Sequence, residues 1–205
     1  MLKSSKLEPR IEPRQARAQD RIRQILDAAF NLLENDIEVT TSSIATHANI
    51  PVGSIYRYFP NVLTIYRTLF EEVNGELRLR IKQTIENATP EQRWDDLFNI
   101  VLMRAVDLYE SRPAYGKLLM IMSTPALQDV RLDCIHTTSR IFKQRWELGH
   151  DGFHDGDIET VAVTAANLFT VIEETYFAYK YGRLDQAVFV ETVKLLKTYL
   201  EIYLD

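Results

Sequence analysis

Cysteine, glycine and proline are all scarce in this sequence, which has one cysteine, seven glycines and seven prolines among its 205 residues. So few glycines and prolines argue against a disordered chain and against a fold with many β-turns. Because Cys134 is the only cysteine, the chain can form no internal disulfide and no zinc site built from cysteines. We therefore expect a protein of a reducing, intracellular compartment.

Long apolar runs are missing as well. The longest segment without a charged residue or a histidine, residues 160–172, has 13 residues and includes threonine and asparagine. A membrane-spanning helix needs roughly 18 or more apolar residues, and the start of the chain is polar and charged where a signal peptide would be apolar. The sequence predicts a cytoplasmic protein without a membrane partner.

Positive charge is in deficit overall, because 24 lysines and arginines face 29 aspartates and glutamates and leave a net charge of -5. The excess of acidic residues is not spread evenly along the chain. Residues 1–23 contain seven basic and three acidic residues, a local charge of +4, so the remainder carries -9. Screening limits the reach of the acidic part to about 10 Å at ordinary salt, so the basic start can still meet a polyanion such as DNA.

Hydrophobic residues make up 46% of the chain, which is enough for a packed core. They recur at spacings of three and four residues and not at two, which predicts an all-α fold. The expected organisation is a flexible basic arm over residues 1–13, a three-helix module over 14–61, a connecting helix over 62–87 and a larger helical domain over 88–205, with the boundary marked by Asn87, Thr89 and Pro90.

Residues 40–61 carry the most informative pattern. A threonine at position 40 or 41 can cap a first short helix. Asn49 ends it, because asparagine is one of the few residues other than glycine that tolerates a left-handed backbone. The pattern predicts a helix that stops and reverses within three or four residues. Its narrow apolar side consists of Ile44, Ala45 and Ala48.

A second short helix, of about seven residues, follows this turn. Pro51 suits its entry, where a fixed φ and a missing N–H cost nothing. Gly53 disfavours a helix by roughly 1 kcal/mol relative to alanine, but it lets the backbone lie against a sugar-phosphate strand. Ile55 and Phe59, four residues apart, are predicted to face inward. Tyrosines at helical spacing are often core, yet the outward side chains here suit phosphates and base edges: Ser54, Tyr56, Arg57 and Tyr58.

The string Ile-Ala-Thr-His-Ala-Asn-Ile-Pro-Val-Gly-Ser-Ile-Tyr-Arg-Tyr-Phe-Pro-Asn, residues 44–61, resembles the signature of the tetracycline-repressor (TetR) family of bacterial transcription regulators. The resemblance covers about residues 20–73. The family usually has glycine where Asn49 stands, a change that the left-handed tolerance of asparagine explains. It usually has a phosphate-gripping lysine where Val62 stands, so one backbone anchor of the family is missing here.

The resemblance implies a dimeric regulator of transcription, a repressor rather than an activator, that binds a near-palindromic operator in double-stranded DNA. Contacts in the groove are expected from Val52, Ser54, Tyr56 and Arg57. Contacts with phosphates are expected from Thr40, Ser42, Tyr58 and the basic arm. The predicted DNA-binding surface is completed by Thr41, Pro51 and Gly53.

The larger domain is rich in bulky soft side chains, each of which would ordinarily be core. TetR-like proteins hold a small effector in this domain, so the resemblance implies that some of these side chains line a cavity for an apolar or aromatic compound. No cofactor is expected. The predicted effector-binding residues are Trp94, Phe98, Leu102, Tyr109, Tyr115, Leu119, Met122, Phe142, Trp146 and Phe169.

The last two predicted helices, Asp157–Tyr181 and about Asp185–Leu204, are apolar on more than one face. A small domain cannot bury such breadth by itself, but a second subunit can. The family resemblance implies that these helices pair with those of a partner as a four-helix bundle. The sequence therefore predicts a homodimer.

Three other interpretations can be weighed against this one. Residues 150–157 place two histidines four apart among carboxylates, which would suit a metal, although a hydrated loop that ends in a helix cap explains the same residues. No nucleophile or phosphate-loop motif is present, so no enzyme is expected. Val62 and the acidic total also fit a TetR-like dimer that binds a ligand or a protein without specific DNA binding.

Overall fold

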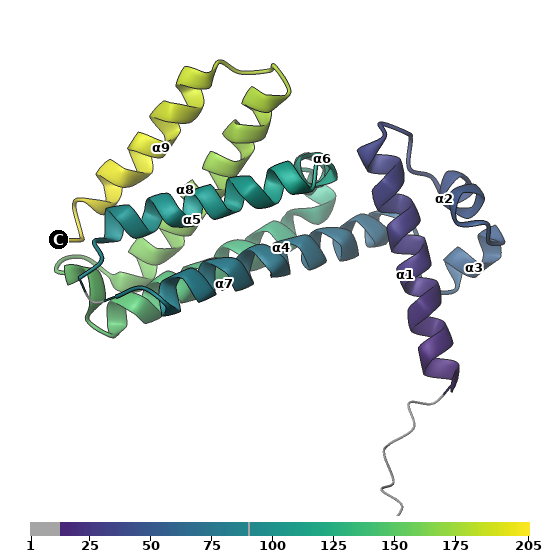
Figure 1. The fold of residues 1–205 in the computed structure, drawn as a ribbon, viewed down its shortest axis with the longest axis horizontal. Coiled ribbons are helices and arrows are strands. Elements are labelled where there is room, and N and C mark those ends of the chain that lie inside the picture. The colour runs from purple at the N-terminus through teal and green to yellow at the C-terminus, as the bar shows by residue number, and fades with distance from the viewer. Residues whose placement is uncertain (1–12, 90) are drawn as a thin grey trace, which may run out of the picture. The chain divides into compact units, whose positions relative to one another are not determined.

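The computed structural model describes residues 13–89 and 91–205, and its regular elements are all helices (Figure 1). No strand occurs within these residues, so the predicted all-α class is confirmed. The chain divides into two compact units between Ile65 and Tyr66. The basic arm predicted over residues 1–13 lies outside the described residues except for its last member. Of the described helices, none is long and apolar enough to span a membrane.

The first unit is built on a three-helix module. Its helices are α1 (Pro13–Glu34), α2 (Thr41–Ala48) and α3 (Val52–Tyr56), and the first residues of α4 (Val62–Glu86) complete it. Just after α1 ends at Glu34, Asp36 takes a left-handed backbone with φ 56°. Six apolar side chains of this unit are at most 1% exposed: Ile25, Leu26, Ala29, Ile44, Ile55 and Ile65.

The second unit contains the rest of α4 and the remaining helices. They are α5 (Trp94–Ser111), α6 (Ala114–Met122), the 3-10 helix η1 (Pro125–Leu127), α7 (Gln128–Glu147), the 3-10 helix η2 (His150–Gly152), α8 (Ile158–Lys180) and α9 (Gln186–Leu200). Helix α8 packs against both α7 and α9, and α8 and α9 form an antiparallel pair (Figure 1).

Helix α8 has nearly its predicted bounds, whereas α9 begins as predicted but ends at Leu200 and not at about Leu204. The Asp157 carboxylate accepts from the Thr160 amide at 2.8 Å, and the Asp185 carboxylate accepts from the Ala187 amide at 2.8 Å. Both are helix caps that satisfy otherwise unpaired amides. Gly182 has φ 68° at the end of α8, a left-handed cap that glycine adopts without strain.

Aromatic rings form the centre of the second unit. Tyr109 and Tyr115 stack with centroids 5.1 Å apart, and Phe70 stacks on Tyr115 at 5.9 Å. Phe177 tilts against Tyr109 at 5.1 Å. Gly116 lies under Phe177, and any β-carbon at this position would collide with that ring. The close approach of α6 and α8 therefore depends on glycine at position 116.

The boundary expected at Asn87, Thr89 and Pro90 is not where the compact units divide. The division lies near the start of α4, because most of the apolar side of that helix is buried with the second unit. Most of the predicted connecting helix therefore belongs to the second unit. The buried side chains concerned are Leu69, Phe70, Val73, Leu77 and Ile81.

The loop over residues 149–156 differs from the predicted hydrated loop. Arg145 donates from Nε and Nη2 to the two carboxylate oxygens of Asp151, each at 2.6 Å, and these side chains are only 7% and 4% exposed. The expectation of a hydrated loop is therefore wrong for Asp151. The positions of Asp151 and Arg145 in the sequence do not by themselves predict that these two side chains pair. In the part of the chain that the structure describes, no three His, Cys, Asp or Glu side chains are grouped to hold a metal ion.

Candidate nucleic-acid interface and ligand cavities

Helix α2 is held at its start by a reciprocal cap. The Thr40 hydroxyl accepts from the Ser43 amide at 3.0 Å, and the Ser43 hydroxyl accepts from the Thr40 amide at 2.8 Å. Such a capping box stabilises a helix start by roughly 1 kcal/mol. The Thr40 hydroxyl is therefore already engaged in capping α2, although the sequence analysis predicts that Thr40 contacts a phosphate. Ser42, in the first turn of α2, is exposed.

The turn between α2 and α3 has the predicted geometry. Asn49 is left-handed, with φ 51° and ψ 50°, and Ile50 is buried beneath it. The Gln24 side-chain amide donates to the Ala48 carbonyl at 2.8 Å, and the Gln24 side-chain oxygen accepts from Arg21 at 2.9 Å. Helix α1 therefore fixes the end of α2. Sequence reasoning missed Gln24, since nothing local links it to a carbonyl 24 residues away.

Helix α3 is shorter than predicted, with five residues instead of about seven. The amides of Tyr58 and Phe59 both donate to the Ile55 carbonyl at 2.9 Å, which closes the last turn. Pro60 follows and disfavours helical backbone in the residue before it. The inward positions are confirmed, because Ile55 is 0% and Phe59 5% exposed. Arg57 and Tyr58 therefore lie in the turn after the helix.

The outer face of α3 is exposed and polar. Tyr56 is 56% exposed, and its hydroxyl lies 3.3 Å from the Thr41 hydroxyl of α2. The Arg57 guanidinium lies 5.9 Å from the centre of the Tyr58 ring. Arg57 makes no ion pair with any described residue, so its charge is free for an external anion. Val52, at the start of the helix, is 37% exposed.

Gly53 lies on the same face, and a β-carbon added there would meet no atom within 4 Å. Its φ is not in the left-handed region. The fold of this unit therefore does not require glycine at position 53. A requirement for glycine there would have to come from an external surface that approaches the backbone.

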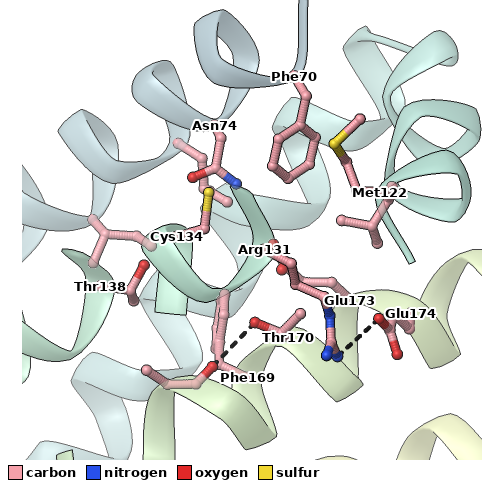
Figure 2. Close-up of a pocket in the computed structure, with 14 residues that line it drawn as sticks. Phe70, Asn74, Met122, Arg131, Cys134, Thr138, Phe169, Thr170, Glu173 and Glu174 are labelled. Carbon is pink, nitrogen blue, oxygen red and sulfur yellow. Dashed lines mark hydrogen bonds and ion pairs between the residues drawn. The ribbon is translucent and has the colours of Figure 1, made fainter. Parts of the chain in front are cut away.

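Two small cavities are among the hollows formed by the described residues of the second unit. The first has a volume of about 20 Å³ and is lined by residues of α4, α6, α7 and α8 (Figure 2). About 10 to 15 Å³ holds one water molecule, so a larger molecule must displace the walls. The lining residues are Phe70, Asn74, Leu77, Ile81, Leu119, Met122, Arg131, Cys134, Thr138, Ala166, Phe169, Thr170, Glu173 and Glu174.

The second cavity, of about 50 Å³, lies among α5, α7, α8 and α9. Its only charged lining residues are Arg145 and Asp151, which already neutralise each other. Apart from the indole N–H groups of two tryptophans, the rest of its wall is apolar. That wall consists of Ile85, Trp94, Leu97, Phe98, Val101, Phe142, Trp146, Ala165, Leu196, Leu200 and Leu204.

Residues 25–61, which include the capped helix α2, the turn and α3, match the family model described as bacterial regulatory proteins of the tetR family. The chain carries a TetR-family N-terminal domain. The nucleoid occlusion factor SlmA of Haemophilus influenzae is 25% identical over 114 residues, which are 54% of this chain and 50% of that protein. This chain thus spans about half the length of the curated relatives it matches.

Solved structures of TetR-family proteins share the whole fold. A TetR-family regulator of Pectobacterium atrosepticum is 15% identical and superposes with a TM-score of 0.70, over 93% of this chain and 97% of its own. RolR in complex with resorcinol is 15% identical, with a TM-score of 0.61 over 88% and 89%. At these identities the likeness concerns the fold, a helix-turn-helix unit followed by a helical unit.

The effector-binding residues that the TetR resemblance indicates do not share one cavity. Leu119, Met122 and Phe169 line the first cavity. Trp94, Phe98, Phe142 and Trp146 line the second. Leu102, Tyr109 and Tyr115 line neither, and the two tyrosines are buried in the aromatic centre.

The first cavity of this TetR fold also has polar residues that sequence reasoning missed. Glu173 is 5% exposed and accepts a short hydrogen bond from the Tyr109 hydroxyl. Burial raises the pKa of Glu173 to about 7, although the Tyr109 hydrogen bond and the charge of Arg131 oppose the rise. Burial likewise raises the pKa of the Cys134 thiol to about 11. A glutamate inside a predicted apolar helix is the one sequence signal that could have indicated this site.

Proposed function

We propose that this protein is a sequence-specific DNA-binding regulator of transcription that acts in the cytoplasm. The observation that carries the proposal is the exposed surface of α3 and of the turn that follows it. Tyr56, at the end of α3, and the unpaired Arg57, in the turn, project from a segment that the buried Ile55 anchors. The same residues fall within the segment that matches the TetR family. A short helix held this way suits the major groove, where an arginine can read guanine.

The proposed contacts divide by chemistry. Base edges are met by Val52, Ser54, Tyr56 and Arg57. Phosphates are met by Ser42, Tyr58 and the basic arm, while Thr41 and Pro51 border the surface and Gly53 admits the DNA backbone. Thr40 acts mainly through its cap, because its hydroxyl holds the start of α2. Val62 supplies no cation at the start of α4.

We also propose that a small effector in the second unit releases the protein from its operator, as expected of a repressor. Helix α4 is one uninterrupted helix from Val62 to Glu86, and its residues Phe70, Asn74, Leu77 and Ile81 form one wall of the first cavity. Because that cavity has room for little more than one water molecule, a larger ligand has to move the wall. A coupling of roughly 1 to 3 kcal/mol would follow. The presence of resorcinol in RolR supports a small-molecule ligand.

A homodimer formed through α8 and α9 completes the proposal. Helix α9 exposes apolar side chains, with Leu195 57%, Val188 42% and Val190 41% exposed. A partner subunit that covers these side chains removes their apolar surface from water, which favours association of the two subunits. Two copies would then read a near-palindromic operator. Sedimentation of the purified protein tests this, and a monomer at micromolar concentration would contradict it.

The deciding experiment selects bound sequences from a random DNA pool and then measures band-shift affinity over a range of salt. A defined, near-palindromic sequence and a steep loss of affinity with salt are expected, because bound phosphates release counterions. The same band-shift assay compares Arg57→Ala with the unaltered protein. Arg93→Ala, which alters an exposed arginine in the second unit, is the matched control. Failure to enrich any sequence would favour the alternative, a TetR-like dimer that binds a ligand or protein partner without specific DNA binding, to which Val62 and the net charge of -5 point.

A further inference from the structure

The first cavity has an apolar body and a polar end. Its apolar walls include Phe70, Leu119, Met122 and Phe169. Its ionisable lining groups are one arginine, two glutamates and one thiol, namely Arg131, Glu173, Glu174 and Cys134. With the thiol neutral, one cation faces two carboxyl groups, so the cavity disfavours an anionic ligand.

Glu173 has unused capacity to accept hydrogen bonds. Its only hydrogen bond within the described residues comes from the Tyr109 hydroxyl, and it makes no ion pair there. A carboxylate has about four acceptor positions. A side chain that is 5% exposed cannot fill the rest from bulk water. Glu173 therefore offers acceptor positions to whatever enters the cavity.

Arg131 has an unmet donor. Its Nη2 pairs with Glu174 at 3.0 Å, drawn as a dashed line in Figure 2, while its Nε is buried and has no acceptor. Buried donors without partners are rare in folded proteins because they lose the hydrogen bonds that they made to water. The charge of Arg131 is near enough to Glu173 to lower the pKa of that carboxyl. One cavity therefore holds an unmet donor and an underused acceptor.

The chemistry of the ligand follows from this pairing. An ammonium group can donate to Glu173 but has no lone pair for Arg131. A carboxylate can accept from Arg131 but would face Glu173 with a like charge. A hydroxyl group does both, since it has one donor hydrogen and two lone pairs. We propose that the first cavity binds a small neutral aromatic compound with a hydroxyl group, which donates to Glu173 and accepts from Arg131.

The apolar walls suit the rest of such a molecule. Phe70 and Phe169 provide aromatic surfaces for a ring, and Met122 is an unbranched side chain that can change its shape to make room. Calling this ligand the effector rests on the proposed function, but binding itself does not. The closing experiment therefore measures binding to the full chain in the absence of DNA.

Four probes of similar size separate the possibilities in calorimetric or NMR titrations: phenol, anisole, toluene and benzylamine. Phenol donates and accepts, anisole only accepts, toluene does neither and benzylamine brings a cation. Phenol is expected to bind about tenfold more tightly than anisole or toluene, because each of these leaves a buried polar group unpaired. Equal binding of phenol and toluene, or tightest binding of benzylamine, would overturn the proposal.

Glu173→Gln locates the contact. Glutamine can still accept from Tyr109 but then turns an NH2 donor towards the ligand, so the preference for phenol over anisole should fall from about tenfold to near equality. Glu110→Gln is the matched control, because Glu110 also accepts from a tyrosine, Tyr176, at 3.0 Å but lines neither cavity. An unchanged preference in Glu173→Gln would refute the assignment. If that variant fails to fold, the order of the four probes on the unaltered protein still decides.

The probe titrations and the selection of bound DNA sequences together keep the two proposals apart. Tight phenol binding by a protein that enriches no DNA sequence would leave the cavity assignment standing and refute the regulator. Specific DNA binding by a protein that binds toluene more tightly than phenol would support the regulator and refute the cavity assignment.

Discussion

The two units of this protein place their polar side chains in opposite ways. Every buried side chain described in the first unit is apolar, and the hydroxyl of Ser42, the phenol of Tyr56 and the guanidinium of Arg57 are exposed on α2, on α3 and in the turn after α3. The second unit buries five polar or charged residues: Asn74, Thr84, Ser139, Arg145 and Glu173. An apolar core with a polar surface suits recognition of a large external polyanion. Polar groups inside a core can meet only a molecule small enough to enter.

Breaking the buried ion pair of the second unit should have the largest effect. Arg145→Met leaves Asp151 buried without a partner and should lower the free energy of unfolding by about 3 to 5 kcal/mol. Urea unfolding measures the loss. Adding Asp151→Asn to the same chain should recover most of it, because the unpaired charge is then gone.

The matched pair in the first unit is Arg23 with Asp27, at 3.5 Å and with both side chains more than half exposed. Arg23→Met should cost less than about 1 kcal/mol, since exposed ion pairs contribute little. A similar loss for Arg23→Met and Arg145→Met would break the contrast between the units.

Glu173 should make stability depend on pH. Its pKa is raised from 4.5 to about 7 by burial, so the folded state binds the proton more tightly than the unfolded state. The stabilisation by protonation is complete below about pH 4.5 and is lost as pH rises through 7. Glu173→Gln should therefore match the original protein near pH 4.5 and exceed its stability above pH 7 by up to about 3 kcal/mol.

Urea unfolding at several pH values measures this difference. The pKa of Glu110 is lowered by its hydrogen bonds from Lys180 and Tyr176. Glu110→Gln should therefore show no gain of stability at high pH. A gain in both variants would mean that the buried position of Glu173 is not the cause. The other titratable or charged groups around Glu173 are Tyr109, Tyr115, Arg131, Cys134 and Glu174.

Arg57→Ala should leave folding intact, because the side chain is exposed and unpaired among the described residues. If Arg57 reads a guanine, the variant should lose about 1 to 3 kcal/mol of preference at one or two base positions. Competition band shifts with single-base operator variants measure that loss. A uniform loss over all sequences would show that Arg57 contacts phosphate only.

Gly53→Ala should have little effect on stability. No atom lies within 4 Å of the added methyl group, so the first unit should be unchanged or stabilised by up to about 1 kcal/mol. DNA affinity should nevertheless fall if the backbone lies against a phosphate. Gly116→Ala is the contrasting control, because its methyl group would collide with Phe177 and should destabilise the second unit by about 1 to 3 kcal/mol. Unaltered DNA affinity in Gly53→Ala would remove position 53 from the interface.

Local chemistry accounts for what could be predicted. The cap at Thr40, the left-handed Asn49, the inward Ile55 and the cap at Asp157 each depend on neighbours within four residues. Short-range hydrogen bonds and side-chain periodicity decide such features, so the printed sequence contains them. Helix α3 is shorter than the sequence pattern predicts, because the backbone turns before Pro60 and does not continue the helix.

By itself, the sequence determined the all-helical class, the helix-turn-helix segment and the caps of the last helices, since these follow from contacts along the chain. Only the tertiary structure decided that Gln24 holds the end of α2, that Arg145 pairs with Asp151 inside the core, and that Glu173 and Arg131 share a cavity. It also placed seven of the ten predicted effector residues in two separate cavities and three in neither of them. These outcomes depend on which helix faces which, and the packing of whole apolar surfaces sets that arrangement, so no short stretch of sequence records it.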